Sequence, residues 1–79
     1  MNKKRRAQIE KPRQRLEAIK DEIETLYEEE KEAFENMPDS LQTSPKGEES
    51  ESAMDKLEDI ASELGLEIDQ LAELTGAVA

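Results

Sequence analysis

Apolar side chains recur at steps of three and four residues through the first half of this 79-residue chain. The ladder consists of Ile9, Leu16, Ile19, Ile23, Leu26, Ala33 and Met37. A repeat of this period places the apolar side chains on one stripe of an α-helix, and such a stripe is typical of a helix that packs against another helix. The pattern therefore predicts an all-α, coiled-coil-like fold.

A second ladder occupies the C-terminal half of the chain. It consists of Leu57, Ile60, Ala61, Leu64, Ile68, Leu71, Ala72 and Leu74. Two helices of similar length joined by one linker predict an antiparallel two-helix hairpin. Gly65 lies inside the second ladder, where it costs about 1 kcal/mol relative to Ala. Because the apolar stripe also slips by about one residue there, we expect the second helix to be kinked or split near Gly65.

Proline and glycine set the expected boundaries within this single domain. Pro12 lacks an amide N–H and suits the first turn of a helix, so residues 1–11 are expected to form a basic N-terminal arm. The alternative is a kinked helix that continues back to about Lys3, since Ile9 keeps the register. Gly76 is a suitable helix stop. The expected segments are a first helix over 12–36, a linker over 37–51, a second helix over 52–75 and a tail over 76–79.

The two apolar stripes are too small to complete the core of an isolated hairpin. Burying about fifteen large apolar side chains falls short of the conformational entropy lost when two helices of this length become ordered. We therefore expect the hairpin to be a homo-oligomer, completed as a dimeric four-helix bundle, or to be completed by a foreign partner. The expected oligomer seam consists of Leu16, Ile19, Ile23, Leu26, Leu57, Ile60, Leu64 and Leu71.

The charges fall into two separate blocks. Residues 1–20 hold eight Lys/Arg and two Asp/Glu, and residues 21–79 hold three against nineteen, which gives +6 and −16 and the total of −10. An antiparallel hairpin would bring the basic start beside Glu67, Asp69 and Glu73, so that the blocks partly neutralise each other, within one chain or between chains. The pattern indicates a protein that works by binding.

The acidic run of the first helix has two interpretations. Carboxylates on a helix present negative charge near the spacing of a phosphate backbone, so the run is expected to compete for a basic, nucleic-acid-binding cleft of another protein. The alternative is a solvated face that keeps a small protein soluble. The expected partner-binding residues combine this face with the linker: Glu28, Glu29, Glu32, Glu35, Met37, Pro38, Leu41 and Gln42.

Glu30 occupies a seam position where an apolar residue is expected. A polar seam residue can fix the register or the choice of partner at a cost in stability. Arg13 or Arg15 from another helix is the expected matching base. The alternative is a splayed helix end from which Glu30 reaches water.

Several classes of function are excluded by what the chain lacks. Without Cys or His it has no disulfide, thiolate nucleophile or ordinary zinc site. It also lacks a glycine-rich phosphate loop and a calcium-binding loop. We therefore expect a protein that is not an enzyme and has no metal or cofactor. No apolar run typical of a signal peptide or a transmembrane helix follows the basic start, so no membrane association is expected.

The basic start itself suggests a nucleic-acid accessory protein as a third hypothesis. It has no interleaved aromatic residues for stacking on bases, and the net charge of −10 opposes binding to a polyanion. Nucleic acid is therefore not the expected direct ligand.

The layout of the whole chain resembles a group of short proteins found in phages and prophages. Those chains open with a Met-Asn-Lys-type basic start and continue as a Glu-rich amphipathic helix, a linker of Asn-Met-Pro-x-Ser-x-Gln type that ends in Gly-Glu, and a Glu/Leu-rich helix. The linker matches at residues 36–42 and 47–48, whereas Pro12 and Gly65 depart from the uninterrupted helices of the pattern.

The resemblance implies a phage setting, and hence the cytoplasm of a bacterial host cell, but no particular mechanism. Small acidic phage proteins are often inhibitors of host machinery, including restriction and CRISPR systems, so by analogy of class the leading hypothesis is a non-enzymatic inhibitor or adaptor that binds a host defence or nucleic-acid-handling protein. The alternative is a self-associating coiled-coil scaffold or assembly protein.

Overall fold

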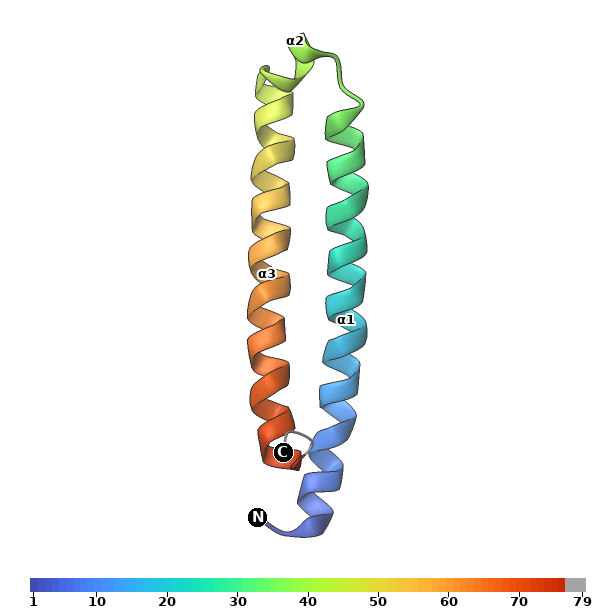
Figure 1. Cartoon of the computed structure of the whole chain (residues 1–79), viewed down its shortest axis with the longest axis vertical. Helices are drawn as coiled ribbons and strands as arrows, with labels where there is room; N and C mark the ends of the chain where they lie inside the picture. The colour runs from blue at the N-terminus through green and yellow to red at the C-terminus, as the bar shows by residue number, and fades with distance from the viewer. Residues whose placement is uncertain (77–79) are drawn as a thin grey trace.

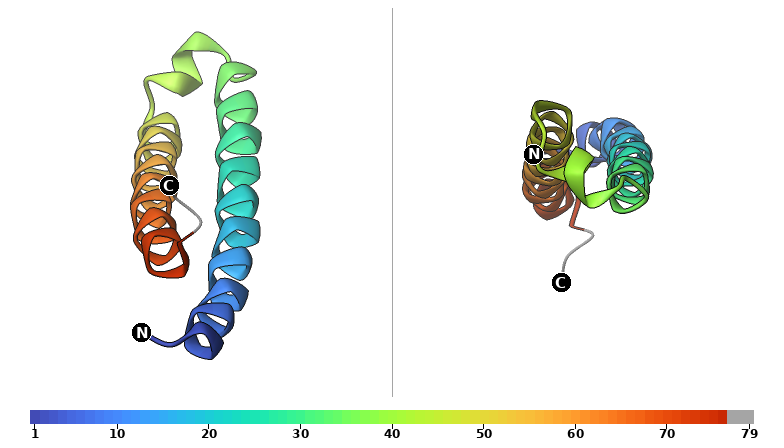
Figure 2. Two further views of the ribbon diagram at one scale, coloured as in Figure 1. Left: turned by 60° about the horizontal axis from the view of Figure 1, so that its bottom comes forward. Right: turned by 90° about the horizontal axis from the view of Figure 1, so that it is seen from above.

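The chain folds as a long helical hairpin. The computed structural model describes residues 1–76 and contains α1 (Lys3–Glu35), α2 (Asp39–Gln42) and α3 (Pro45–Thr75). α1 and α3 lie antiparallel and side by side, and the short α2 closes one end (Figure 1). The views of Figure 2 show the same pairing along and across the long axis of a rod of 58 × 18 × 14 Å. The predicted all-helical hairpin is confirmed.

α1 begins well before the predicted start at Pro12. Asn2 is its N-cap, and the side-chain oxygen of Asn2 accepts a hydrogen bond of 2.7 Å from the backbone N–H of Arg5. Pro12 lies inside the helix, where it removes one backbone hydrogen bond without ending the helix. The prediction of a separate arm over 1–11 is wrong, and the alternative of a helix that reaches Lys3 is correct.

α3 also begins earlier than predicted, at Pro45 instead of residue 52. Ser44 is its N-cap, with a side-chain oxygen 3.4 Å from the backbone nitrogen of Gly47, and Pro45 occupies the first turn, where its missing N–H costs nothing. The linker predicted over 37–51 is therefore shortened to 36–44, and α2 occupies part of it.

The two glycines that were predicted to interrupt or end α3 behave differently. α3 continues through Gly65, so the predicted kink or split is wrong. A Cβ added at Gly65 would lie 3.3 Å from Cε of Lys20, which shows that the stem of this lysine lies across α3 at the glycine. Gly76 ends α3 in the left-handed conformation, with φ of 77°, as predicted.

Two heptad columns of each helix face the other helix. Their members are all buried or half-buried. The columns of α1 are Ile9, Leu16, Ile23 and Glu30, continued by Met37 just beyond the helix, and Arg13, Lys20, Tyr27 and Phe34. The columns of α3 are Gly47, Met54, Ala61, Ile68 and Thr75, and Ser50, Leu57, Leu64 and Leu71. Within the single chain, one predicted column of α1 faces α3. Ile19, Leu26 and Ala33 of the other predicted column are exposed, and the column one residue later faces α3 instead.

The core between the helices is thin. Among residues 1–76 the buried apolar side chains are Ala61, Ile68 and Ala72, and no large side chain is completely buried. α1 contributes no buried residue over its whole described length. Most of the apolar side chains of the hairpin therefore remain partly in contact with solvent.

Candidate interaction surfaces

A hydrogen bond between side chains of α1 and α3 lies inside the seam near the closed end of the hairpin. The hydroxyl of Ser50 donates to Glu30 Oε1 at 2.6 Å, and Ser50 is 4% exposed. Arg13 and Arg15 lie about four turns from Glu30 on the same helix, so either could pair with Glu30 only from the helix of a second copy. The predicted alternative, a splayed helix end, is wrong, since Glu30 is held against α3.

Two basic side chains lie in the seam toward the other end of the rod. Arg13 bonds to Glu10 and Glu17, and its hydrogen bond lowers the pKa of Glu10 below the usual value. Lys20 bonds to Glu24, and this hydrogen bond raises the pKa of Lys20. Arg13 and Lys20 occupy the inward column of α1 in which an alternative rotation of the helix would place Ile19 and Leu26, whereas Glu30 belongs to the other inward column.

This rotation creates an apolar surface along one side of the rod. In an antiparallel helix pair, the residues that flank the inner columns on one side of α1 lie beside the equivalent residues of α3. Ile19, Leu26 and Ile60 flank the inner columns on that side, and the inner-column residues Leu16, Ile23, Leu57, Leu64 and Leu71 border it. We call these eight residues, which are those of the predicted oligomer seam, the apolar flank. Ile19, Leu26 and Ile60 remain 43–49% exposed, and the other five are half-buried.

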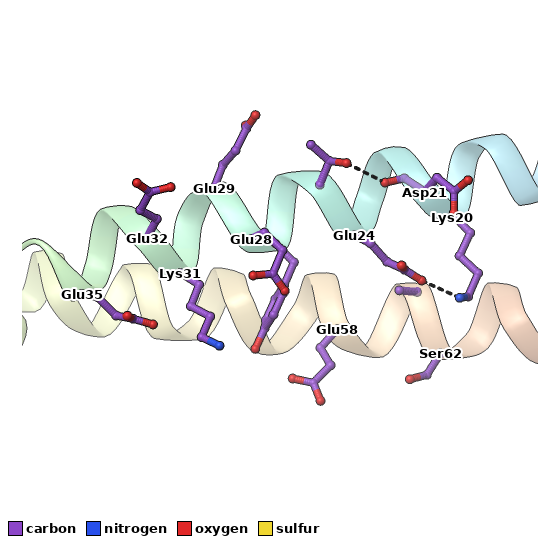
Figure 3. A pocket seen from close by; sticks show the side chains of 13 residues that line it. Lys20, Asp21, Glu24, Glu28, Glu29, Lys31, Glu32, Glu35, Glu58 and Ser62 are labelled. Carbon is purple, nitrogen blue, oxygen red and sulfur yellow. Dashed lines mark hydrogen bonds and ion pairs between the residues drawn. The ribbon is translucent and has the colours of Figure 1, made fainter.

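The opposite side of the rod is an open groove lined mainly by carboxylates. Its acidic residues are Asp21, Glu24, Glu28, Glu29, Glu32 and Glu35 of α1 and Glu58 of α3, and we call it the acidic groove. Figure 3 shows Glu24, Glu28 and Lys31 of α1 on the same side as Glu58 of α3. Of these carboxylates, only Glu24 forms an ion pair among the residues that the structure describes. The groove therefore carries a surplus of negative charge that the chain itself does not neutralise.

The predicted partner-binding residues lie partly in this groove. Glu28, Glu29, Glu32 and Glu35 are exposed and line it. The four linker residues of the prediction lie beyond it, at the closed end of the rod: Met37, Pro38, Leu41 and Gln42. Pro38 is exposed, whereas Met37, Leu41 and Gln42 are half-buried.

Gln42 has a structural role at the closed end. Its side-chain amide donates to the carbonyl oxygen of Phe34 at 3.0 Å and so satisfies a backbone acceptor in the last turn of α1. α2 packs closely on the start of α3, because a Cβ at Gly47 would collide with the backbone carbonyl of Gln42 and lie 2.6 Å from the carbonyl oxygen of Leu41. The small residues Gly47 and Ser50, which continue the spacing of the second ladder backwards, are the signal that the sequence analysis missed.

The expected neutralisation of the two charge blocks across the hairpin does not occur through ion pairs. All three ion pairs among residues 1–76 join neighbours within α1. Glu67, Asp69 and Glu73 therefore make no ion pair with the basic start of the chain. The charge asymmetry of the sequence persists in the folded rod.

Other kinds of site are not found in the described part of the chain. Residues 1–76 contain no group of three or more acidic side chains arranged to hold a metal ion. None of the three helices combines the length and the apolar character needed to cross a bilayer. Comparisons with protein-family models, curated protein sequences and solved structures found no match for the chain.

Proposed function

We propose that this chain is a non-enzymatic binding protein whose acidic groove engages a basic surface of a protein partner. The observation that carries the proposal is the charge density of the closed end of the rod. Residues 21–35 and 48–63 run side by side and contain fifteen Asp/Glu and two Lys. At 1.5 Å per residue they span about 24 Å, or one net negative charge per about 1.8 Å of axis.

This value is close to the one charge per about 1.7 Å of duplex DNA. A cleft that has evolved to bind nucleic acid would be attracted to such a rod by long-range electrostatics, and the like charges on a nucleic acid would be repelled by it. We therefore infer that the partner is a nucleic-acid-handling protein. The resemblance to phage proteins suggests that this partner is a host defence protein. The rod would then act as a nucleic-acid mimic in the bacterial cytoplasm.

The exposed linker residue Pro38 and the half-buried Met37 and Leu41 extend the proposed contact at the closed end. Apolar contacts of this kind slow dissociation, whereas the carboxylates speed the encounter. The role of Gln42 in the hairpin itself makes it the poorest target for mutation among the four linker residues.

The test is a charge reversal with a matched control. Replacing Glu28, Glu29, Glu32 and Glu35 with Lys should abolish capture of basic proteins from a bacterial lysate at low salt and leave helicity by circular dichroism unchanged. The control reverses four exposed carboxylates outside the groove and outside residues 21–35 and 48–63, at Glu17, Glu67, Asp69 and Glu73, for the same change in net charge. An equal loss of captured protein in both variants would show that only net charge matters. Capture that persists in the groove variant would reject the groove as the binding site.

A second candidate function is a self-associating scaffold. The observation that favours it is the apolar flank, where aliphatic side chains from both helices remain exposed on one side of the rod. Such a protein would associate with copies of itself in the absence of any other partner.

A further inference from the structure

The rod exposes more surface than a compact chain of its mass. The folded chain exposes 5992 Å², whereas a compact monomer of 9.0 kDa exposes about 4,900 Å². The excess of about 1,100 Å² is larger than the roughly 800 Å² that each partner contributes to a standard interface. One additional contact along the rod is therefore enough to bring its exposed area to that of an ordinary folded protein.

The charges of the rod select the direction in which a second rod can lie. The closed half, residues 21–63, holds sixteen Asp/Glu and three Lys and has a net charge of −13. The open half, residues 1–20 with 64–76, has a net charge of +3, because +6 on α1 exceeds −3 on α3. Two rods in parallel would place the two halves of −13 together, whereas two antiparallel rods place each negative half beside a positive one.

The start of α1 adds a second argument for a partner of opposite charge. Lys3, Lys4, Arg5 and Arg6 lie in the first turns of the helix, where the helix dipole disfavours positive charge. Figure 1 shows that this part of α1 extends beyond the end of α3. These four residues make no ion pair with any of residues 1–76. Their placement is unfavourable in the single chain and becomes favourable beside carboxylates of another chain.

We propose that the apolar flank binds the apolar flank of a second copy of this chain in an antiparallel, two-fold symmetric four-helix bundle. In this dimer the four basic residues of each α1 lie beside the acidic closed half of the partner. The two acidic grooves face outward, because each lies on the side of its rod opposite the interface. The inference rests on self-association, the second candidate function, and specifies how two copies pack together. This dimer leaves the acidic groove free for the proposed protein partner.

The direction of the dimer is tested by electron–electron distance measurement. The chain has no Cys, so a single spin label can be attached through Ser40→Cys, which lies exposed on α2 at the closed end. An antiparallel dimer separates the two labels by about 50 Å, close to the 58 Å length of the rod. A parallel dimer brings them within about 20–30 Å, since neighbouring helix axes are about 10 Å apart. The short distance would overturn the antiparallel geometry but leave self-association intact.

The position of the interface is tested by sedimentation equilibrium of two matched variants. Ile60→Glu introduces a charge into the apolar flank and should weaken dimerisation by at least about a hundredfold. Leu66→Glu makes the same change on the same helix at a side chain that is more exposed, 64% against 43%. Leu66 is not a flank residue but borders the same shallow hollow as Ile60 and Leu64, so this variant should weaken dimerisation much less than Ile60→Glu. Circular dichroism verifies the helicity of both variants.

Two results would overturn the assignment of the interface. Equal weakening in Ile60→Glu and Leu66→Glu would place the interface elsewhere. A natural chain that remains at 9.0 kDa at every concentration would reject self-association and assign the flank to a foreign protein. Neither result bears on the acidic groove, because the capture of basic proteins from a bacterial lysate tests the groove independently.

Discussion

The two sides of this rod are built from the same two helices, yet one is aliphatic and the other is lined with carboxylates. Their difference depends on how each helix is rotated about its own axis. If α1 were rotated so that Ile19 and Leu26 faced α3, the apolar flank would lose its most exposed α1 residues. The observed rotation turns Lys20 and Tyr27 inward instead. Polar groups in the seam thus preserve an apolar surface outside it, at the expense of the core of the single hairpin.

Apolar residues inside the seam and on the flank should respond differently to truncation. Ile68→Ala removes a side chain that is 7% exposed, and it should destabilise the fold by about 2–4 kcal/mol at every protein concentration. Ile60→Ala removes one that is 43% exposed, and it should cost under about 1 kcal/mol in dilute solution and more as the chains associate. Urea denaturation at two concentrations measures both values. A cost for Ile60→Ala that does not change with concentration would contradict the difference between seam and flank.

The same substitution at two glycines should have opposite effects. Gly47→Ala forces a Cβ into the backbone of α2, and it should destabilise the closed end by about 2–3 kcal/mol, because backbone cannot move aside as a side chain can.

Gly65→Ala meets only the flexible stem of Lys20, and the better helix propensity of Ala should raise stability by about 0.5–1 kcal/mol. Thermal unfolding of the two variants gives the signs. Destabilisation by Gly65→Ala would show that Lys20 cannot yield and that its inward position is rigidly fixed.

The hydrogen bond between Glu30 and Ser50 should contribute to the rotation of the helices. Ser50→Ala leaves a half-buried carboxylate without its donor and should cost about 1–2 kcal/mol. The double variant Glu30→Met with Ser50→Ala removes both groups, so it should recover the lost stability. Chemical denaturation measures the stability, and the spin-label distance shows whether the dimer keeps its geometry. If the double variant does not recover the free energy of unfolding, the Glu30–Ser50 hydrogen bond contributes more to stability than the mutual pairing of two polar groups.

The smallest expected effect comes from the ion pairs of the open half. The hydrogen bond from Arg13 lowers the pKa of Glu10, so this pair stabilises the fold above about pH 4.5 and its contribution is lost as the pH falls through the lowered pKa. Glu10→Gln should therefore lower the midpoint of thermal unfolding slightly at pH 7, and the difference from the natural chain should shrink as the pH falls through the lowered pKa of Glu10. A difference that does not change with pH would assign it to packing instead of charge.

The sequence predicts the architecture better than it predicts the ends of the helices. The spacing of Leu16, Ile23, Leu57 and Leu64 is sufficient for a helical hairpin, because the heptad period is a property of the apolar residues themselves. The start of α3 was missed because Ser44-Pro45 is a capping signal that precedes a polar stretch with no apolar repeat. The rotation of α1 could not be predicted, since Ile19 and Leu26 fit a seam better than Lys20 by hydrophobicity alone. Only the facing surface of α3, with Gly65 opposite the lysine stem, shows why Lys20 is accommodated.

The acidic residues illustrate a different limit. Their positions on the surface follow from the helical period, and Glu28 and Glu32 lie where the sequence places them. Whether the basic start neutralises Glu67, Asp69 and Glu73 depends instead on side-chain geometry. No ion pair joins α1 and α3 among residues 1–76, which leaves neutralisation between chains as the remaining alternative.

The central claim is that one side of the rod is covered by a second copy and the other is left open. Single cysteines at Leu26→Cys on the apolar flank and Glu28→Cys in the acidic groove report on the two sides through their rates of reaction with a small thiol reagent. As the protein concentration rises from roughly 1 µM to roughly 500 µM, the rate at position 26 should fall by about tenfold or more, because paired chains shield it, while the rate at position 28 stays constant. Rates that remain constant at both positions, or protection at position 28 alone, would contradict this account.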